Sequence, residues 1–372
     1  MTANRNPRVA IVAASLDILG GQGVQARSLV DAMRADGNRV MFVPINPRFP
    51  RPLAGLRKYP GLRTVVNQSI YLPGLARLAG VDVAHVFSAS YASFLLAPLP
   101  AMTVARSLNK RVVLHYHSGE ADDHLANWGA LVHPWLKLAH HIVVPSEYLR
   151  GVFAKYGYQV HVIPNVIDLS HFTFRPRRPV RPRLLSARNL ELHYRVDVII
   201  EAFARLKQSV PAATLIVAGS GTQESRLKSL AANCGADGIE FVGSVDPAMM
   251  PELYDRADIF LNASVVDNQP VSILEAFASG LPVISTPTGD IGSLVADDHT
   301  GFLVPPFSPE AMASAIERVL QQPAHAGDCA QRAYDSLHRF TWPAVRDAWA
   351  RIYRAPSSAG LGQSWTTSPR VH

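Results

Sequence analysis

Two acidic side chains separated by seven residues are the most informative chemical feature of this 372-residue sequence. Asp267 and Glu275 lie in the segment 262–286, which reads NASVVDNQPVSILEAFASGLPVIST. Pro270 stands where a first helical residue is expected, and Ser279-Gly280 stands where that helix should end. Asp267 then precedes the positive end of a helix dipole, and Glu275 lies about a turn and a half into the helix. Both carboxylates can therefore line one cavity at different depths.

Two glycine-rich loops could offer backbone N–H groups to an anion. Gly219 and Gly221 directly follow an expected strand at 214–218, and side chains there would keep a phosphate or ribose away from the backbone. Gly20, Gly21 and Gly23 open a helix and match a dinucleotide-binding fingerprint. However, about six residues separate them from the preceding strand, and the next strand ends without an acid. A nicotinamide-dependent dehydrogenase is therefore disfavoured, and a tight turn alone remains an alternative for this loop.

Short β-branched runs alternate with helical patterns along the chain, which indicates parallel sheets covered on both faces. In the first half, strands are expected at 8–13, 40–44, 83–87, 111–115, 141–144 and 160–163, and helices at 23–35, 122–137 and 147–156. In the second half, strands are expected at 184–187, 214–218, 240–242, 258–261 and 283–285, and helices at 196–207, 223–233, 249–256 and 271–278. The sequence predicts two doubly wound α/β domains facing a cleft.

A basic, proline-rich segment, FTFRPRRPVRPR at 172–183, separates the two series. A solvated interdomain linker is favoured over a nucleic-acid-binding patch. We expect an N-terminal domain over 1–170, the linker over 171–183 and a second domain over 184–340. A helix over 341–356 should cross back to the first domain, and 357–372 should be a disordered tail.

Composition excludes further classes of protein. Apolar residues at 48% and charged residues at 17% predict a folded core, and a net charge of +7 favours an anionic ligand or a membrane surface. The uncharged stretch 86–105 approaches membrane-spanning length, but Pro98 and Pro100 interrupt it, so a buried strand, loop and helix are expected. Two cysteines and a polar start without a secretory signal favour a reducing, cytoplasmic compartment.

The ordered series of motifs resembles the family-four retaining glycosyltransferases, which have the GT-B architecture of two Rossmann-like domains. The acid–seven–acid segment resembles the signature of their donor domain. The histidine-bearing loop 114–119 (LHYHSG) and the segments 142–150 and 162–168 resemble parts of the acceptor domain, and 187–204 resembles the start of the donor domain. The resemblance covers roughly residues 8–345 and implies that the first domain binds the acceptor and the second binds a nucleotide sugar.

The resemblance implies roles for individual residues. Asp267, His117 and Arg188 would be catalytic: Asp267 near the transferred sugar, His117 near the reaction centre, and Arg188 on the donor diphosphate. Glu275 would accept hydrogen bonds from ribose hydroxyls. The other implied donor-binding positions are Gly219, Gly221, Asn268, Gln269, Pro270, Val271, Arg195, His193, Gly20, Gly21 and Gly23. In contrast, His115 is expected to be an ordinary core or surface histidine.

Three positions depart from the family pattern. The first acid is usually glutamate and is Asp267 here. The usual lysine is replaced by His193, with Arg195 close by as the preferred second cation, and the usual glycine pair is Gly289-Asp290. Asp267 and His193 leave open a nucleotide-sugar-binding protein with little or no turnover. A separate alternative is an epimerase of similar fold, which would act on the nucleotide sugar without an acceptor.

The implied reaction is a retaining transfer of a sugar to an acceptor hydroxyl of a glycan, a lipid-linked molecule or a small molecule. No Asp-x-Asp pattern occurs, so no metal and no cofactor beyond the nucleotide sugar are expected. Asp267 as a covalent nucleophile is the less favoured alternative to a positioning role. Five basic residues could contact a membrane or lipid-linked acceptor, or form a solvated loop: Arg48, Arg51, Arg57, Lys58 and Arg63. Nucleic acid is not an expected partner, and the inner face of the cell membrane is the alternative location.

Overall fold

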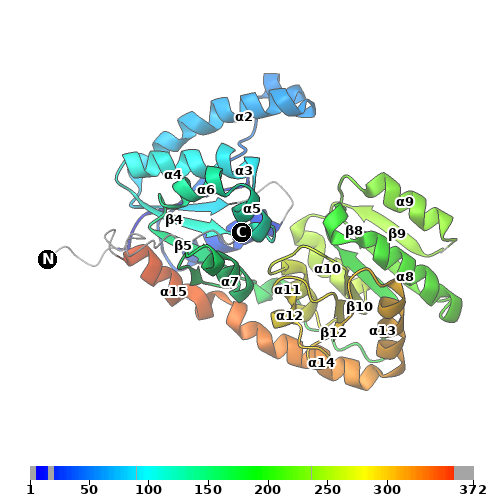
Figure 1. Ribbon diagram of the computed structural model, residues 1–372. Helices are drawn as coiled ribbons and strands as arrows, with labels where there is room; N and C mark the ends of the chain where they lie inside the picture. The colour runs from blue at the N-terminus through cyan, green and yellow to red at the C-terminus, as the bar shows by residue number, and fades with distance from the viewer. Residues whose placement is uncertain (1–5, 16–20, 89, 236, 356–372) are drawn as a thin grey trace, which may run out of the picture. The chain divides into compact units, whose positions relative to one another are not determined.

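The computed structural model describes residues 6–15, 21–88, 90–235 and 237–355 (Figure 1). The chain divides into two compact units. Unit 1 contains Met1–Ile18, Ala26–Ile163 and Arg346–His372, and unit 2 contains Leu19–Gln25 and Pro164–Val345. Each unit is built on a six-stranded parallel sheet with flanking helices, which confirms the predicted pair of doubly wound α/β folds.

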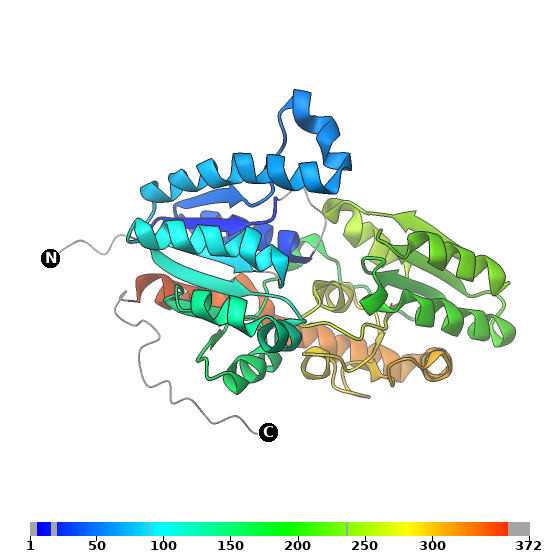
Figure 2. The same ribbon diagram turned by 45° about the horizontal axis from the view of Figure 1, so that its top comes forward.

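The sheet of unit 1 has the strand order β2-β1-β3-β4-β5-β6. Its strands are β1 Val9–Ala13, β2 Val40–Pro44, β3 Val83–Ser88, β4 Arg111–Tyr116, β5 His141–Val144 and β6 His161–Val162. Its helices are the larger part of α1 Gly21–Ala35, α2 Pro60–Gly74, α3 Ala92–Leu96, α4 Pro98–Ser107, α5 Ala121–Asn127, α6 Gly129–Leu136, α7 Glu147–Lys155 and most of α15 Trp342–Arg354. Within this unit, α2 lies at the periphery (Figures 1 and 2).

The two faces of this sheet carry different side chains, because successive residues of a strand point to opposite sides. Val86 and Leu114 belong to the main apolar core of unit 1. On β3 and β4, His85 and His115 alternate with these core residues and contact the aromatic side chains of α15 instead. One face of the sheet is therefore rich in imidazole rings.

The sheet of unit 2 has the strand order β12-β11-β10-β7-β8-β9. Its strands are β7 Arg183–Ala187, β8 Thr214–Ala218, β9 Ile239–Gly243, β10 Ile259–Asn262, β11 Val283–Ser285 and β12 Phe302–Leu303. Its helices are α8 Val196–Ser209, α9 Glu224–Asn233, α10 Met250–Arg256, α11 Val271–Ala278, α12 Ile291–Leu294, α13 Pro309–Gln321 and α14 Pro323–Asp335. Two apolar clusters form its core.

Several elements differ from the sequence expectation. The two-residue strand β12 and the helices α2, α13 and α14 were not predicted, and the helix expected at 122–137 is broken at Trp128, where α5 ends and α6 begins at a glycine. The uncharged stretch 86–105 contains the end of β3, then α3 and most of α4. Within the described ranges, none of the helices is long and apolar enough to cross a membrane.

The basic segment 172–183 differs most from the expected solvated linker. Arg177 is fully buried, and its guanidinium donates to the backbone oxygens of Tyr254 (3.0 Å) and Ala257 (3.2 Å). Asp258, also buried, accepts hydrogen bonds from the side chains of Arg181 (3.0 Å) and Arg183 (2.9 Å). Burial alone would raise the pKa of Asp258, but the bonds from these arginines outweigh it and hold the pKa below its usual range. The arginine spacing therefore serves the folding of unit 2.

Candidate active site

The candidate site of unit 2 is built where three neighbouring strands end. β10, β7 and β8 are adjacent and parallel, so their carboxyl ends lie at one edge of the sheet. Arg188 directly follows β7, Gly219 directly follows β8, and the loop with Asp267 follows β10. Ligands of open α/β sheets bind beyond this edge. The topology thus explains why residues far apart in the sequence meet here.

Arg188 is the centre of this site. One of its terminal nitrogens lies 2.5 Å from a carboxylate oxygen of Asp267, and the other donates to the hydroxyl of Ser272 at 3.2 Å. The guanidinium also lies over the ring of Tyr194, 4.2 Å from its centroid, which is a cation–π arrangement. Both charged side chains are only 10% exposed. The sequence did not single out Ser272 or Tyr194, although both lie within a few residues of predicted positions.

Glycines allow the loops of the site to approach one another closely. Gly219 has φ +132°, and a Cβ atom there would lie 2.0 Å from the backbone oxygen of Arg188. At Gly221 a Cβ would lie 2.4 Å from the backbone oxygen of Leu190. Gly289, with φ +61°, packs in the same way against the backbone oxygen of Asp267. The sequence predicts that the first two glycines leave room for a ligand. The structure shows that they also let their loop pack directly against the backbone of Arg188 and Leu190.

The second acid lies deeper, on α11. Pro270 is the residue before the helix rather than its first residue, and α11 begins at Val271. Glu275 is partly exposed, and its carboxylate accepts a hydrogen bond of 2.8 Å from the hydroxyl of Tyr254 on α10. Burial raises the pKa of Glu275 to about 7, although the Tyr254 bond and the Arg188 charge act in the opposite direction. Tyr254 was missed because it lies 21 residues before its partner on another helix.

Side-chain amide groups fix the part of the loop that follows Asp267. Asn268 and Gln269 are buried, and the side-chain oxygen of Gln269 accepts from the backbone N–H of Asn165 at 2.7 Å. The Asn165 amide nitrogen donates in return to the backbone oxygen of Gln269 at 3.1 Å. Neither contact involves a charge, so this part of the loop is fixed by shape and hydrogen bonding.

The glycine-rich turn at the start of α1 belongs to unit 2, not to the first domain as expected. Gly20 lies outside the described residues, and Gly21 and Gly23 are in the first turn of α1. Two residues further, the side chain of Gln25 makes both hydrogen bonds with the backbone of Val166, at 3.1 Å and 2.9 Å. This amide attaches the glycine-rich turn to the segment that also holds Gln269.

The two candidates for the second cation have different surroundings. The backbone oxygen of His193 accepts from the N–H of Val265 at 2.8 Å, which ties His193 to the loop bearing Asp267. Arg195 pairs instead with Asp197 at 2.9 Å and lies over the ring of Phe307. The preferred candidate from sequence was Arg195, but the direct tie to the acid-bearing loop is made by His193.

The third predicted catalytic residue, His117, belongs to unit 1. It follows β4, and its ring stacks on Phe87 with centroids 5.0 Å apart and lies 4.0 Å from the ring of His115. Burial lowers the pKa of His117 to about 3, so the imidazole is neutral at pH 7. The structure therefore brings Arg188, Asp267 and Glu275 together in unit 2 and places His117 in a separate aromatic setting.

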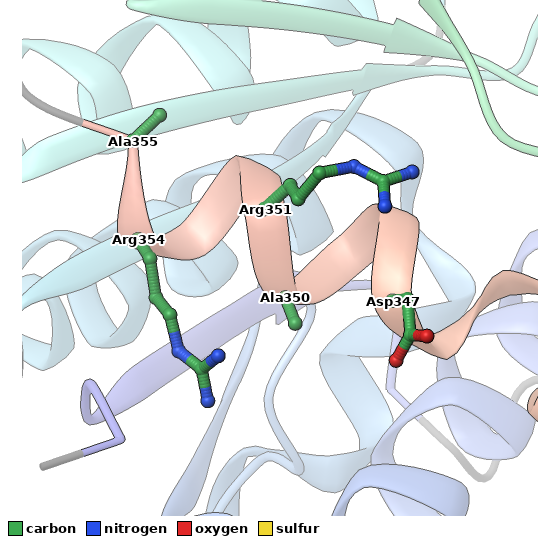
Figure 3. A pocket seen from close by; sticks show the side chains of 5 residues that line it. All are labelled: Asp347, Ala350, Arg351, Arg354 and Ala355. Carbon is green, nitrogen blue, oxygen red and sulfur yellow. The ribbon is translucent and has the colours of Figure 1, made fainter. Parts of the chain in front are cut away.

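Other features of the described ranges do not belong to this site. The hollow in Figure 3 is lined by Asp347, Ala350, Arg351 and Arg354 of α15 and by Ala355, which directly follows the helix; none is a predicted site residue. In the part of the chain that the structure describes, no three His, Cys, Asp or Glu side chains are grouped to hold a metal ion. Metal independence of the reaction stays a prediction.

Two doubly wound sheets, with an arginine and two acids at the carboxyl edge of the second, define the fold class of the protein, the GT-B architecture. The family follows from two matches along the chain. Residues 19–171 match the family described as Glycosyltransferase Family 4, and residues 173–336 match the one described as Glycosyl transferases group 1. The chain belongs to this family of glycosyltransferases.

Relatives and solved structures agree. The glycogen synthase of Mycobacterium tuberculosis is 30% identical over 273 residues, which are 69% of this chain and just under two thirds (66%) of that protein. The phosphatidyl-myo-inositol mannosyltransferase of Mycolicibacterium smegmatis is 23% identical over 93% of both chains. Anabaena Alr3699/HepE in complex with UDP-glucose (17% identity, TM-score 0.74) and the sucrose-phosphate synthase of Thermosynechococcus elongatus (20%, 0.75) share the fold, each over 93% of this chain and 98% of theirs.

Proposed function

We propose that this protein transfers a sugar from a nucleotide-diphosphate sugar to an acceptor hydroxyl with retention at the anomeric carbon and without a metal ion. The observation that carries the proposal is the contact of Arg188 with Asp267 and Ser272 beside the start of α11, with Glu275 deeper on the same helix. This arrangement offers an always-charged guanidinium and a helix N-terminus for a diphosphate, and two carboxylates for hydroxyl groups.

The charges suit the reaction. Breaking the anomeric C–O bond leaves negative charge on the departing diphosphate and positive charge on the sugar. Arg188 and the N–H groups at the start of α11 stabilise the first, and the Asp267 carboxylate stabilises the second. The acceptor oxygen forms the new bond on the face that the diphosphate leaves, and its proton passes to a diphosphate oxygen. Asp267 already accepts from Arg188, which supports a positioning role over that of a covalent nucleophile.

Glu275 is proposed to bind the ribose of the nucleotide. A carboxylate that accepts from Tyr254 retains lone pairs for ribose hydroxyls, and the tyrosine bond fixes its orientation. This role requires the ionised form, so burial works against it and Arg188 works for it. Arg195 would add positive charge near the diphosphate, and His193, whose backbone oxygen accepts from Val265, would lie beside the loop that bears Asp267.

The test is a donor panel assayed with purified protein, starting with UDP-glucose because a protein of the same fold binds it. Donor hydrolysis and transfer to simple acceptors should persist in EDTA, and the anomeric configuration of the product should match that of the donor by NMR. Arg188→Lys should lose at least about 100-fold in kcat, because a lysine cannot reproduce the bidentate fork. An exposed arginine of the same unit, Arg178→Lys, is the control.

Three outcomes would contradict the proposal. Donor binding without hydrolysis or transfer would favour the binding protein. An epimerised nucleotide sugar after incubation without acceptor would favour the epimerase. Loss of turnover in EDTA that a divalent metal restores would refute metal independence.

We further propose that the acceptor is reached at an anionic membrane surface. Residues 37–81 contain seven Lys or Arg and no Asp or Glu, a local charge as large as the net charge of the whole chain. The 3₁₀ segment Arg51–Lys58 and α2 also expose large apolar side chains: Leu53, Tyr59, Leu62, Val65 and Leu72. On α2 the spacing of Leu62, Val65 and Leu72 places them along one side, while Tyr71 packs inward. A basic stretch with an apolar stripe is suited to a charged lipid surface.

Vesicle sedimentation tests this second proposal. The protein should bind phosphatidylglycerol vesicles and not phosphatidylcholine vesicles, and added salt should weaken binding. Lys58→Glu with Arg63→Glu should abolish binding, and Leu62→Ser with Val65→Ser should weaken it. Leu131→Ser, an equally exposed leucine on α6, should change nothing. Equal binding to both kinds of vesicle, or none to either, would refute the proposal. The names of two relatives, the mannosyltransferase and an alpha-monoglucosyldiacylglycerol synthase of Streptococcus pneumoniae, refer to lipids and support it.

A further inference from the structure

A chain of hydrogen bonds runs through the imidazole-rich face of unit 1 and ends beside His117. The hydroxyl of Tyr353, on the last turn of α15, lies 2.8 Å from Nδ1 of His85 on β3. Nε2 of His85 lies 3.1 Å from Nδ1 of His115 on β4. The sequence separations are 268 and 30 residues, so only the fold brings these groups together.

This chain of hydrogen bonds is shielded from water. Both histidines and Tyr353 are buried, and the indole of Trp349 covers the two imidazoles, with centroids 4.8 Å from His85 and 5.0 Å from His115. Arg111 donates to the backbone oxygen of Tyr353 and so fixes the end of α15 on the sheet. The helix therefore cannot turn without breaking a buried contact.

The donors and acceptors in this chain of hydrogen bonds can be assigned. Burial raises the pKa of Tyr353 well above its usual value and lowers those of His85 and His115, so all three groups are neutral at pH 7. The other printed partner of the Tyr353 hydroxyl is the thioether of Met33 at 3.7 Å, which is a weak acceptor. The Tyr353 hydroxyl therefore donates a hydrogen bond to Nδ1 of His85, and Nε2–H of His85 donates to Nδ1 of His115. The proton of His115 is then on its Nε2.

The end of the chain lies against the predicted catalytic histidine. Nε2 of His115 is buried and has no hydrogen-bond partner among the described residues. The ring of His117 is 4.0 Å from that of His115, closer than the rings of His85, Phe87 and Trp349 at 4.8 to 5.1 Å. The orientation of the His115 ring thus limits where the His117 ring can lie.

We propose that Tyr353 and His85 are positioning residues, which hold His115 in one tautomer and through it fix the ring of His117 for sugar transfer. This inference rests on the proposed function. It makes α15, the last helix of the described residues, part of the machinery.

Tyr353→Phe removes only the hydroxyl and tests the proposal. Histidine-selective ¹⁵N labelling reports the tautomer of each ring, because a protonated and a bare nitrogen resonate far apart and exchange averages them. In the wild type His115 should show one fixed tautomer, and in the variant its two nitrogens should move toward averaging and the His117 signals should shift. Turnover should fall about 2- to 30-fold with the donor KM unchanged, the range typical of coupled residues that do not touch the ligand.

Tyr158→Phe is the matched control, because it removes another tyrosine–histidine hydrogen bond of unit 1, the part-buried 2.7 Å contact with His133 Nδ1. It should move the His133 signals and leave those of His85, His115 and His117, and turnover, unchanged. If Tyr353→Phe does not fold, His85→Gln tests the same chain, and the His115 tautomer should again become averaged.

Unchanged His115 and His117 signals in a folded Tyr353→Phe protein would overturn the proposal, as would an equal loss of turnover in the control. A wild-type protein that transfers no sugar would refute the proposed function instead. In that case the tautomer measurement would still decide whether the chain orders His115 and His117.

Discussion

Ionisation of Glu275 should cost folding free energy, and replacement by glutamine measures that cost. The pKa of this carboxyl is raised from the ordinary 4.5 to about 7. Each pKa unit corresponds to about 1.4 kcal/mol, so the ionised form destabilises the fold by at most about 3 kcal/mol. The figure is an upper bound because the side chain is partly exposed.

The direction follows from the raised pKa. Below about pH 4.5 the carboxyl is protonated in both the folded and the unfolded protein, so ionisation of Glu275 costs no folding free energy there. Between about pH 4.5 and 7 the unfolded protein loses this proton while the folded protein keeps it, so folding stability falls until, above about pH 7, the carboxyl is ionised in both states. Glu275→Gln cannot ionise and still accepts the Tyr254 hydrogen bond. The variant should therefore gain on the wild type between pH 5 and pH 8.

Thermal unfolding followed by circular dichroism at a series of pH values checks this. About 2.5 kcal/mol of this effect falls between pH 5 and pH 8, so the Tm of Glu275→Gln minus that of the wild type should rise by up to about 5 to 10 °C over that range, given about 2 to 4 °C per kcal/mol for a unit of this size. Effects of the other carboxyls cancel in the difference. Glu252→Gln, an exposed glutamate on α10, should show no such trend. A difference that is constant with pH, or that falls, would refute the reasoning.

Three other changes have defined outcomes. Gly219→Ala should destabilise by about 2 to 4 kcal/mol in denaturant unfolding, since its Cβ would overlap the Arg188 backbone, whereas Gly235→Ala, with φ +62° and open space, should cost about 1 kcal/mol; equal costs would argue against the overlap. Asp258→Asn should cost about 3 to 5 kcal/mol, because it leaves the buried Arg177 and the partly exposed arginines beside it without their counter-charge. Its exposed neighbour Asp255→Asn should cost under about 1 kcal/mol, and a mild effect at 258 would show that the cluster is dispensable. Donor affinity measured by calorimetry should rise with pH through about 7 in the wild type only, not in Glu275→Gln.

The sheets could be predicted from sequence because their strands are short, apolar and separated by helices. The strands of a parallel sheet are buried on both faces, so they stand out in the sequence as short, nearly continuous apolar runs. β12 has only two residues, too few for any periodic signal. α2 was missed because its polar and basic residues, bounded by prolines, were attributed to a loop.

The site could be predicted only where its residues lie in continuous motifs. Asp267 and Glu275 share one segment, and Arg188 follows a recognisable strand. Tyr254 could not be found, since nothing in the sequence shows that α10 turns its hydroxyl toward α11. The sequence predicts for His115 only an ordinary core or surface histidine, because the alternation of a strand does not say what packs on either face.

The burial of Arg177 also sets where the chain can be cut. The segment before β7 was expected to join two domains, but its guanidinium is surrounded by the backbone of 254–258 and of Ser279. A fragment that starts at residue 184 would omit all four arginines paired with Asp258 and leave its carboxylate uncompensated. Attempts to express the second half of the chain by itself should therefore start upstream of residue 172, so that the segment 172–183 can fold together with the rest of unit 2.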